Sequence, residues 1–423
     1  MSILITNGTE LRNAVNRLVQ NTPATDVHTH LYPASFSELM LYGIDELLTY
    51  HYLVAETFRH SSLSYDEFWG LEKHHQADHI WSTLFLEHTP ISEATRGVLT
   101  TINKLGLVSD EPKLSQYRDW YDQIQPQELV DLVFDLAKVK DVVMTNDPFD
   151  QDERDKWNSK ANVRSSLDNR FHSALRLDPL LNDWETTAKK LNQWGYRVDA
   201  QLGETDDESL GEITRFLWEW IQKIDPLYLA ASLPSDFKYP NSDIRTILIQ
   251  KCILPICAKA KLPLSIMVGV KRGVNPSLRL AGDMLASADV TSIENLCRDF
   301  PNQKFLVTFL SREDQHHLSV LARKFKNLMI FGCWWFLNTP SLIKETTQMR
   351  FELLGTSFVP QHSDARILEQ LIYKWSHSRA VIADVLVDQY QGVLDTGWKI
   401  THDEVERDVN DLLSDNFWRF IKK

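Results

Sequence analysis

The stretch Ala24-Thr25-Asp26-Val27-His28-Thr29-His30-Leu31 is an apolar, β-branched run that ends in a His-x-His pair. In an extended strand, residues two apart point to the same face, so the imidazoles of His28 and His30 can converge on one metal ion. The pair alone is a weak signal, because 14 histidines among 423 residues give roughly half of one such pair by chance. The metal hypothesis therefore depends on what the rest of the chain places beside this strand.

Similar apolar runs recur along the chain, with helical patterns between most of them. Such runs are typical of parallel strands buried on both faces, and eight of them alternating with helices predict an α/β fold, a closed (β/α)8 barrel of the TIM type. Polar residues that follow the strands then meet at one mouth. The expected strands are Ala24 to Leu31, Asp141 to Asn146, Phe171 to Leu177, Leu227 to Leu233, Leu264 to Val270, Phe305 to Leu310, Leu328 to Trp334 and Thr356 to Pro360.

A long region without a convincing strand, Phe36 to Lys140, separates the first two expected strands. We interpret it as a helical insertion that forms part of the site wall, because it leaves the carboxyl end of strand one. The expected division is 1–35 for the barrel start with strand one, 36–140 for the insertion, and 141–423 for the remaining barrel and a C-terminal helix. Expected helices are Leu47 to Phe58, Gln127 to Val139, Trp184 to Trp194, Glu313 to Phe325, Ile367 to Tyr390 and Asp403 to Phe420.

The composition excludes several classes of partner. The formal net charge is −13 and no block of lysines or arginines stands out, which argues against nucleic acid or an anionic membrane. Cys252, Cys257, Cys297 and Cys333 show neither disulfide spacing nor a C-x-x-C pair, so we interpret them as buried thiols of a cytoplasmic protein. The apolar run at residues 3–5 is too short for a signal peptide, and the longest run, 328–337, is too short to cross a bilayer.

Asp364, just after the eighth expected strand, is the best carboxylate to complete a site with His28 and His30. Two imidazoles and a carboxylate can hold zinc and leave a coordination position for substrate or water. Asp147 and Asp178 remain alternatives, although each precedes a proline and fits a turn.

Two arginines fit the binding of an anion. Arg176 lies inside an apolar run, where a guanidinium needs a carboxylate or phosphate partner. A substrate anion is the functional interpretation, and an ion pair with Asp178 is the structural alternative. Arg366 either clamps a substrate carboxylate or orients Asp364.

The aromatic residues allow two interpretations. His51 and Tyr52 are a proton-handling pair if they reach the barrel mouth, although their spacing also fits packed residues on a helix. Trp334, Trp335 and Trp375 are either core residues or an aromatic wall that suits the apolar face of a sugar. The sequence contains no dinucleotide-binding, P-loop, G-x-S-x-G or redox-disulfide motif.

Four segments together resemble the uronate (glucuronate) isomerase family: Asp26 to Leu31, Leu47 to Tyr52, Ala174 to Asp178, and His362 to Arg366. That family belongs to the metal-dependent amidohydrolase superfamily of distorted (β/α)8 barrels. The resemblance spans the whole chain and implies an aldose–ketose isomerase that converts D-glucuronate to D-fructuronate and D-galacturonate to D-tagaturonate.

Carried over residue by residue, the resemblance implies one divalent metal, zinc, held by His28, His30 and Asp364. It also implies proton transfer by His51 and Tyr52, with Asp364 as a further catalytic group, and substrate contacts from Arg176 and Arg366. We add Trp375 as a substrate-binding residue and expect a homo-oligomer that acts on a small sugar acid.

Departures from the superfamily pattern restrict the number of metal ions that the site can hold. Val270-Lys271 and Ser311-Arg312 stand where many superfamily hydrolases carry metal-binding histidines, after strands five and six. No lysine ends strand four, so a bridging carbamate for two metals has no candidate there. One metal is the most that this pattern supports. A mononuclear metal-dependent hydrolase and a silent sugar-acid-binding barrel remain the alternatives.

Overall fold

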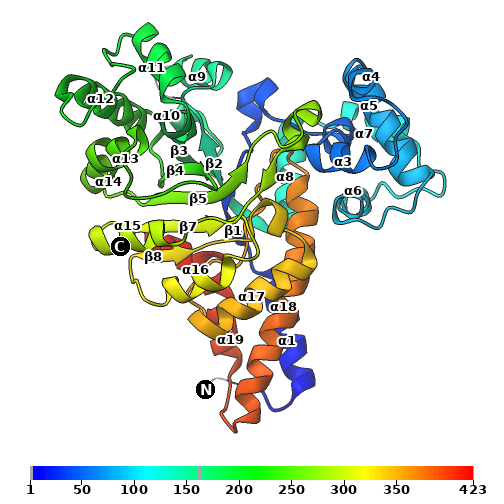
Figure 1. Cartoon of the computed structure of the whole chain (residues 1–423). Coiled ribbons are helices and arrows are strands. Elements are labelled where there is room, and N and C mark those ends of the chain that lie inside the picture. Colours follow the sequence, from blue (N-terminus) through cyan, green and yellow to red (C-terminus); the bar gives the residue numbers. More distant parts are fainter. Residues whose placement is uncertain (1–2, 160–162, 423) are drawn as a thin grey trace.

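The computed structural model describes residues 3–159 and 163–422. Within these residues, the centre of the molecule is a curled sheet of seven parallel strands in the order β1-β2-β3-β4-β5-β7-β8, and a short β6 pairs antiparallel with β5 (Figure 1). The strands are β1 Ala24–Thr29, β2 Val139–Asn146, β3 Phe171–Arg176, β4 Leu229–Pro234, β5 Leu264–Lys271, β6 Met284–Leu285, β7 Phe305–Phe309 and β8 Leu328–Ile330. The first seven expected strands are therefore confirmed, with ends that differ by a few residues.

Both faces of the sheet are buried, which explains why its strands have near-continuous apolar sequences. All six residues of β1 are buried. Alternate residues of the strands belong to two clusters: Val27 and Val143 to one, and Val142 and Leu175 to the larger cluster that includes the surrounding helices. The sheet is thus a rigid frame for the side chains at its carboxyl edge.

The eighth expected strand, Thr356 to Pro360, is not a regular strand in the structure. Val359 forms a single bridge with Phe331, and Pro360 has no N–H group to donate to a ladder. The chain nevertheless continues to β1, because the Asp364 N–H donates to the His28 carbonyl (3.2 Å) and the His30 N–H donates to the Ala365 carbonyl (2.7 Å). Residues 359–365 therefore join β8 to β1 without forming the predicted strand.

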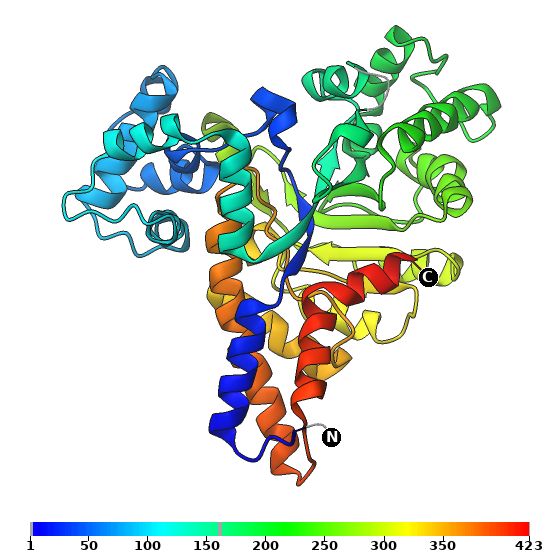
Figure 2. The same ribbon diagram turned by 180° about the vertical axis from the view of Figure 1, so that it is seen from behind.

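Between β1 and β2 the described chain forms helices and no regular strand. Figures 1 and 2 show α3 to α7 gathered on one side of the sheet, while α9 to α14 lie on the other. That residues 36–140 are an insertion, and that the domains divide at 35 and 140, stay predictions. The helices of this region are α2 Ile44–Leu48, α3 His51–Thr57, α4 Tyr65–Trp69, α5 Lys73–Trp81, α6 Glu93–Lys104, α7 Leu114–Gln123 and α8 Pro126–Ala137, with η1 Ala34–Leu39 and η2 Ser82–Leu86.

The remaining helices comprise α1, which precedes β1, and those that follow the later strands. Helices α1 and α18 pack side by side and project with α19 from one end of the molecule (Figure 2). In the described ranges, no helix combines the length and the hydropathy that crossing a membrane requires. These helices are α1 Gly8–Asn21, α9 Gln151–Asn158, α10 Asp178–Asn182, α11 Trp184–Gln193, α12 Asp207–Ile224, α13 Ile244–Leu248, α14 Leu254–Ala260, α15 Thr291–Asp299, α16 Gln315–Ala322, α17 Pro340–Leu354, α18 Gln370–Asp395, α19 His402–Asn410 and α20 Asn416–Lys422.

Candidate active site

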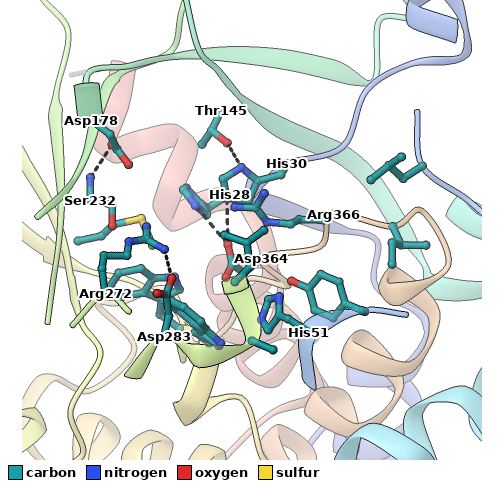
Figure 3. Close-up of a pocket in the computed structure, with 18 of the residues that line it drawn as sticks. His28, His30, His51, Thr145, Asp178, Ser232, Arg272, Asp283, Asp364 and Arg366 are labelled. Atoms are coloured by element: carbon teal, nitrogen blue, oxygen red, sulfur yellow. Dashed lines mark hydrogen bonds and ion pairs between the residues drawn. The ribbon is translucent and has the colours of Figure 1, made fainter. Parts of the chain in front are cut away.

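A cavity of about 370 Å³ opens at the carboxyl ends of the strands. Its wall combines residues from β1, β3 and the segment after β8 with residues from the helical region and from the arm that follows β5 (Figure 3). The sequence-predicted site residues that line this cavity are His28, His30, His51, Arg176, Asp364 and Arg366, and those that do not are Tyr52 and Trp375.

His28, His30 and Asp364 converge in the cavity. The distances from the Asp364 Oδ1 atom to the Nε2 atoms of His28 and His30 are 3.5 and 3.4 Å, and one ligand atom from each residue lies within 4.8 Å of the other two. Burial by itself would raise the pKa of Asp364, but the two imidazoles hold that pKa well below its ordinary value. An anionic carboxylate facing two imidazoles is a donor set that fits a divalent metal ion.

The ring of His30 is oriented by Thr145 on β2. The Thr145 hydroxyl donates its only proton to the Thr29 carbonyl (3.0 Å), so it can only accept at the 2.7 Å contact with His30 Nδ1. With its proton on Nδ1, donated to Thr145, His30 would offer the lone pair of Nε2 to a metal ion. Burial first, and then the charge of Arg366, lower the pKa of His30 well below its ordinary value, which keeps this imidazole in the neutral form that binds metals.

Arg176 ends β3 and forms the ion pair with Asp178 that was its structural alternative, while its contact with a substrate anion stays a prediction. It donates from NH2 to Asp178 Oδ2 at 2.7 Å, and Asp178 Oδ1 in turn accepts from the Ser232 N–H (2.8 Å). Burial would lower the pKa of Arg176, but Asp178 and then Asp147 raise it. Arg176 is therefore a fixed, permanently charged group on the cavity wall, and this hydrogen bond uses one of its five N–H donors.

Arg366 lies beside the candidate ligands (Figure 3). Its backbone N–H donates to Gln370 Oε1 (2.9 Å), which fixes the start of α18. In the described part of the chain no ion pair holds its guanidinium, whose charge acts on the nearby His30 and Tyr50. A guanidinium that lies in a cavity without an ion-pair partner is suited to binding an anionic ligand.

The segment that carries His51 differs from the prediction. Leu47 to Phe58 is not one helix, because α2 ends at Leu48 and the backbone of Tyr50 is extended (φ −67°, ψ 143°), so that α3 begins only at His51. As a result Tyr50, which the sequence analysis did not select, lines the cavity together with His51. Burial raises the pKa of Tyr50, and the Arg366 guanidinium opposes that shift.

His51 and Tyr52 have different surroundings. Burial, followed by the charge of Arg366, lowers the pKa of His51 to about 3, so its imidazole is neutral. The Tyr52 hydroxyl is buried and has no hydrogen-bond partner among the described residues, while the Lys374 ammonium lies 5.3 Å from the centre of its ring. The two rings are neighbours, with centroids 4.4 Å apart.

Trp375 does not fit a substrate-binding role. It is 1% exposed, and its indole N–H donates to Asp26 Oδ2 (2.8 Å) behind the cavity. Trp334 and Trp335 do line the cavity, so the aromatic wall comes from the turn after β8 and not from α18.

Part of the wall was not predicted from the sequence. The arm after β5, residues 272–285, contributes Arg272, Arg279 and Asp283. Asp283 pairs with Arg272 and accepts from the Gly273 N–H (2.9 Å), which folds the arm back over the cavity mouth. The sequence signal nearest to this arm is the basic pair Lys271-Arg272, which follows the fifth expected strand.

Comparisons with known proteins identify similar chains among solved structures. An uronate isomerase from Bacillus halodurans C-125 is 51% identical, with a TM-score of 0.95 over 99% of this chain and 98% of that chain. An uronate isomerase from Thermotoga maritima is 16% identical (TM-score 0.75, 99% of each chain). A glucuronate isomerase from Caulobacter crescentus is 14% identical (TM-score 0.76, 98% and 94%).

These last two likenesses concern the fold alone. No protein-family model and no curated protein matches the chain.

Proposed function

Because this chain belongs to the uronate isomerase family, it is a sugar-acid isomerase, and we propose that it interconverts D-glucuronate with D-fructuronate and D-galacturonate with D-tagaturonate. One observation carries the choice of substrate class: the candidate metal ligands share a single cavity with the guanidinium groups of Arg176 and Arg366. A carboxylate at one end of the substrate and a developing oxyanion at the other need positive charge at two places.

We propose that His28, His30 and Asp364 hold one divalent ion and that this ion is zinc. When bound, such an ion withdraws negative charge from a substrate oxygen. The neutral form of His30 and the anionic form of Asp364 support this assignment. The ends of β5 and β7 carry no histidine, in agreement with a single ion.

The reaction moves one carbon-bound proton within the open-chain sugar. A base removes the proton from C2, an enediolate forms with its negative charge on O1, and the same group returns the proton to C1. The O2 hydroxyl proton passes to O1, so the aldehyde at C1 becomes a hydroxymethyl group and C2 becomes a ketone. This sequence needs one proton carrier near both carbons and a cation near O1.

Each arginine has a place in this scheme. Arg176 binds the substrate carboxylate, because Asp178 holds the guanidinium in place while leaving N–H donors free. Arg366 stabilises the enediolate, because it lies near the candidate metal ligands without an ion-pair partner (Figure 3). Asp364 assists opening of the sugar ring by accepting a hydroxyl proton.

We assign the proton shuttle between C2 and C1 to Tyr52, assisted by His51. Support comes from the buried, unpartnered Tyr52 hydroxyl beside a neutral imidazole. This role requires the first turn of α3 to bring that hydroxyl to the cavity when substrate binds, and catalytic hydrogen bonds often tighten only in the substrate complex. Tyr50 is the alternative carrier, because its side chain already lines the cavity.

The test is turnover of a panel of uronates in D₂O with zinc-loaded protein, followed by NMR. We expect ketose signals from D-glucuronate and D-galacturonate, and none from D-glucose, which lacks the carboxylate. The Asp364→Ala variant serves as the inactive control. Absence of ketose from every uronate with the zinc-loaded protein would contradict the proposed substrates.

A further inference from the structure

Asp26 is a buried carboxylate that the scheme above does not use. It lies on β1, two residues before His28, and is 0% exposed. Both of its oxygens accept from the Ser363 N–H (3.0 and 3.2 Å), and Oδ2 also accepts from the Trp375 indole (2.8 Å). A carboxylate is costly to bury unless donors satisfy it, so these hydrogen bonds hold the groups around it in place.

The residue after Ser363 has an unusual backbone conformation. Asp364 has a φ of 53°, in the left-handed region that non-glycine residues seldom adopt. Such a conformation persists only where the surrounding contacts fix it. Here the Asp364 N–H donates to the His28 carbonyl (3.2 Å), and the Ala365 N–H donates to the Ser363 hydroxyl (3.1 Å).

Asp26 therefore connects the two pieces of chain that carry the candidate ligands. Asp26 and His28 lie on β1 and His30 follows its last residue, which fixes the spacing of the carboxylate and the two imidazoles. Asp364 belongs to an irregular segment that no regular ladder holds. The hydrogen bonds from Ser363 to Asp26 tie this segment to the strand one residue before the ligand.

We propose that Asp26 is a positioning residue for the metal site: its carboxylate holds the Ser363 amide so that Asp364, in its strained conformation, faces His28 and His30. This inference rests on the proposed metal site. Without the hydrogen bonds from the Ser363 N–H to Asp26, Asp364 relaxes to an ordinary backbone conformation and its carboxylate moves away from the imidazoles.

The test compares zinc binding by the full-length chain with that of the Asp26→Asn variant, using titration calorimetry. We expect the substitution to lower zinc affinity by about ten- to a hundredfold, as loss of a partner that orients a ligand typically does. The cobalt-loaded variant is expected to have an altered visible absorption spectrum. Asp141→Asn is the matched control, since Asp141 lies on β2 and contacts His172 but does not line the cavity.

A double-mutant cycle distinguishes a positioning role of Asp26 from a purely structural one. In an Asp364→Ala background, Asp26→Asn should change zinc affinity less than twofold, because the hydrogen bonds between Ser363 and Asp26 affect zinc binding only through Asp364. An equal loss of zinc affinity on Asp26→Asn in both backgrounds, or an unchanged zinc affinity in the single variant, would overturn the inference. Should Asp26→Asn not fold, Asp26→Glu, which keeps the charge but displaces the carboxylate, takes its place with the same expected loss.

A failure of the proposed metal site gives a different result. An unsubstituted chain that binds no zinc overturns the metal site and this inference with it. An unsubstituted chain that binds one zinc ion, with the same affinity as the variant, overturns only the role of Asp26.

Discussion

Tyr50 and Tyr52 flank His51, and their rings are neighbours, with centroids 5.0 Å apart. Tyr50 lines the cavity, whereas the Tyr52 hydroxyl is buried without a partner in the described structure. A proton carrier must reach C1 and C2 of the substrate, so replacing its hydroxyl removes the chemical step, while replacing a wall residue mainly changes binding.

We predict that Tyr52→Phe lowers kcat at least about a hundredfold with little change in KM, as expected for loss of a group that transfers protons. Tyr50→Phe, the matched variant, should keep kcat within about tenfold and change KM. Steady-state kinetics on D-glucuronate measure both. The reverse pattern would transfer the shuttle to Tyr50.

Some site residues could be predicted from the sequence because the fold brings them together by a general rule. His28, His30 and Asp364 follow strands at opposite ends of the chain, and the carboxyl ends of parallel strands meet. The environment of Trp375 could not be predicted in this way. Its indole satisfies a buried carboxylate, Asp26, whose burial depends on the whole assembled core.

At the scale of elements, α3 and α4 hold the arm after β5 to the helical region, and the Tyr65 hydroxyl of α4 accepts from Asn275 Nδ2 (3.2 Å). The Trp69 indole N–H donates to the Ser277 carbonyl (2.8 Å), and the Arg279 guanidinium lies 4.4 Å from the centre of the Trp69 ring. Trp69 and Arg279 both line the cavity. Trp69 of α4 therefore contributes a hydrogen bond and a cation–π contact to the position of the arm.

We predict that Trp69→Ala raises KM for D-glucuronate about tenfold and leaves kcat within about threefold, because the lost hydrogen bond and cation–π contact together amount to roughly 1.5–2 kcal/mol. Steady-state kinetics provide the measurement. Trp398→Ala is the control, since Trp398 is 68% exposed and remote from the cavity. An unchanged KM in Trp69→Ala would show that the arm keeps its position without this contact.

The limits of sequence-based prediction are also visible in particular elements. Of the eight strands that apolar runs predicted, seven are confirmed, because burial on both faces requires such sequences. The break between α2 and α3 was missed, because no glycine or proline marks it and the apolar pattern does not encode the extended backbone of Tyr50. That break lies beside Tyr50 and His51, which line the cavity, so a part of the fold that the sequence pattern does not encode shapes the cavity wall.

At the scale of the whole molecule, buried carboxyl groups connect the helical region to the sheet. Glu369, just before α18, is 0% exposed and accepts from the Gly43 N–H (2.8 Å). The same junction contains a bridge between Leu41 and Ile367. Burial raises the pKa of Glu369 from 4.5 to about 7, so this carboxyl group keeps its proton in the folded chain at pH values where the unfolded chain has released it.

The sign of the resulting pH dependence follows from that proton. Between pH 4.5 and about 7 the folded chain binds more protons at this position than the unfolded chain, so the contribution of Glu369 to stability falls as the pH rises and is constant above that window. The interval between the two pKa values corresponds to about 3 kcal/mol. The Glu369→Gln variant, whose side chain is neutral at every pH, lacks this loss of stability.

We therefore predict that the free energy of unfolding of Glu369→Gln, relative to the unsubstituted chain, increases by about 3 kcal/mol between pH 4 and pH 8. Urea unfolding at a series of pH values measures the difference, and taking it against the unsubstituted chain cancels the contributions of all other groups. Glu352→Gln, at an exposed position on α17, should give a difference that does not change with pH. Parallel stability curves for Glu369→Gln and the unsubstituted chain would mean that Glu369 is ionised in the folded protein and that the junction between the helical region and the sheet carries a buried charge.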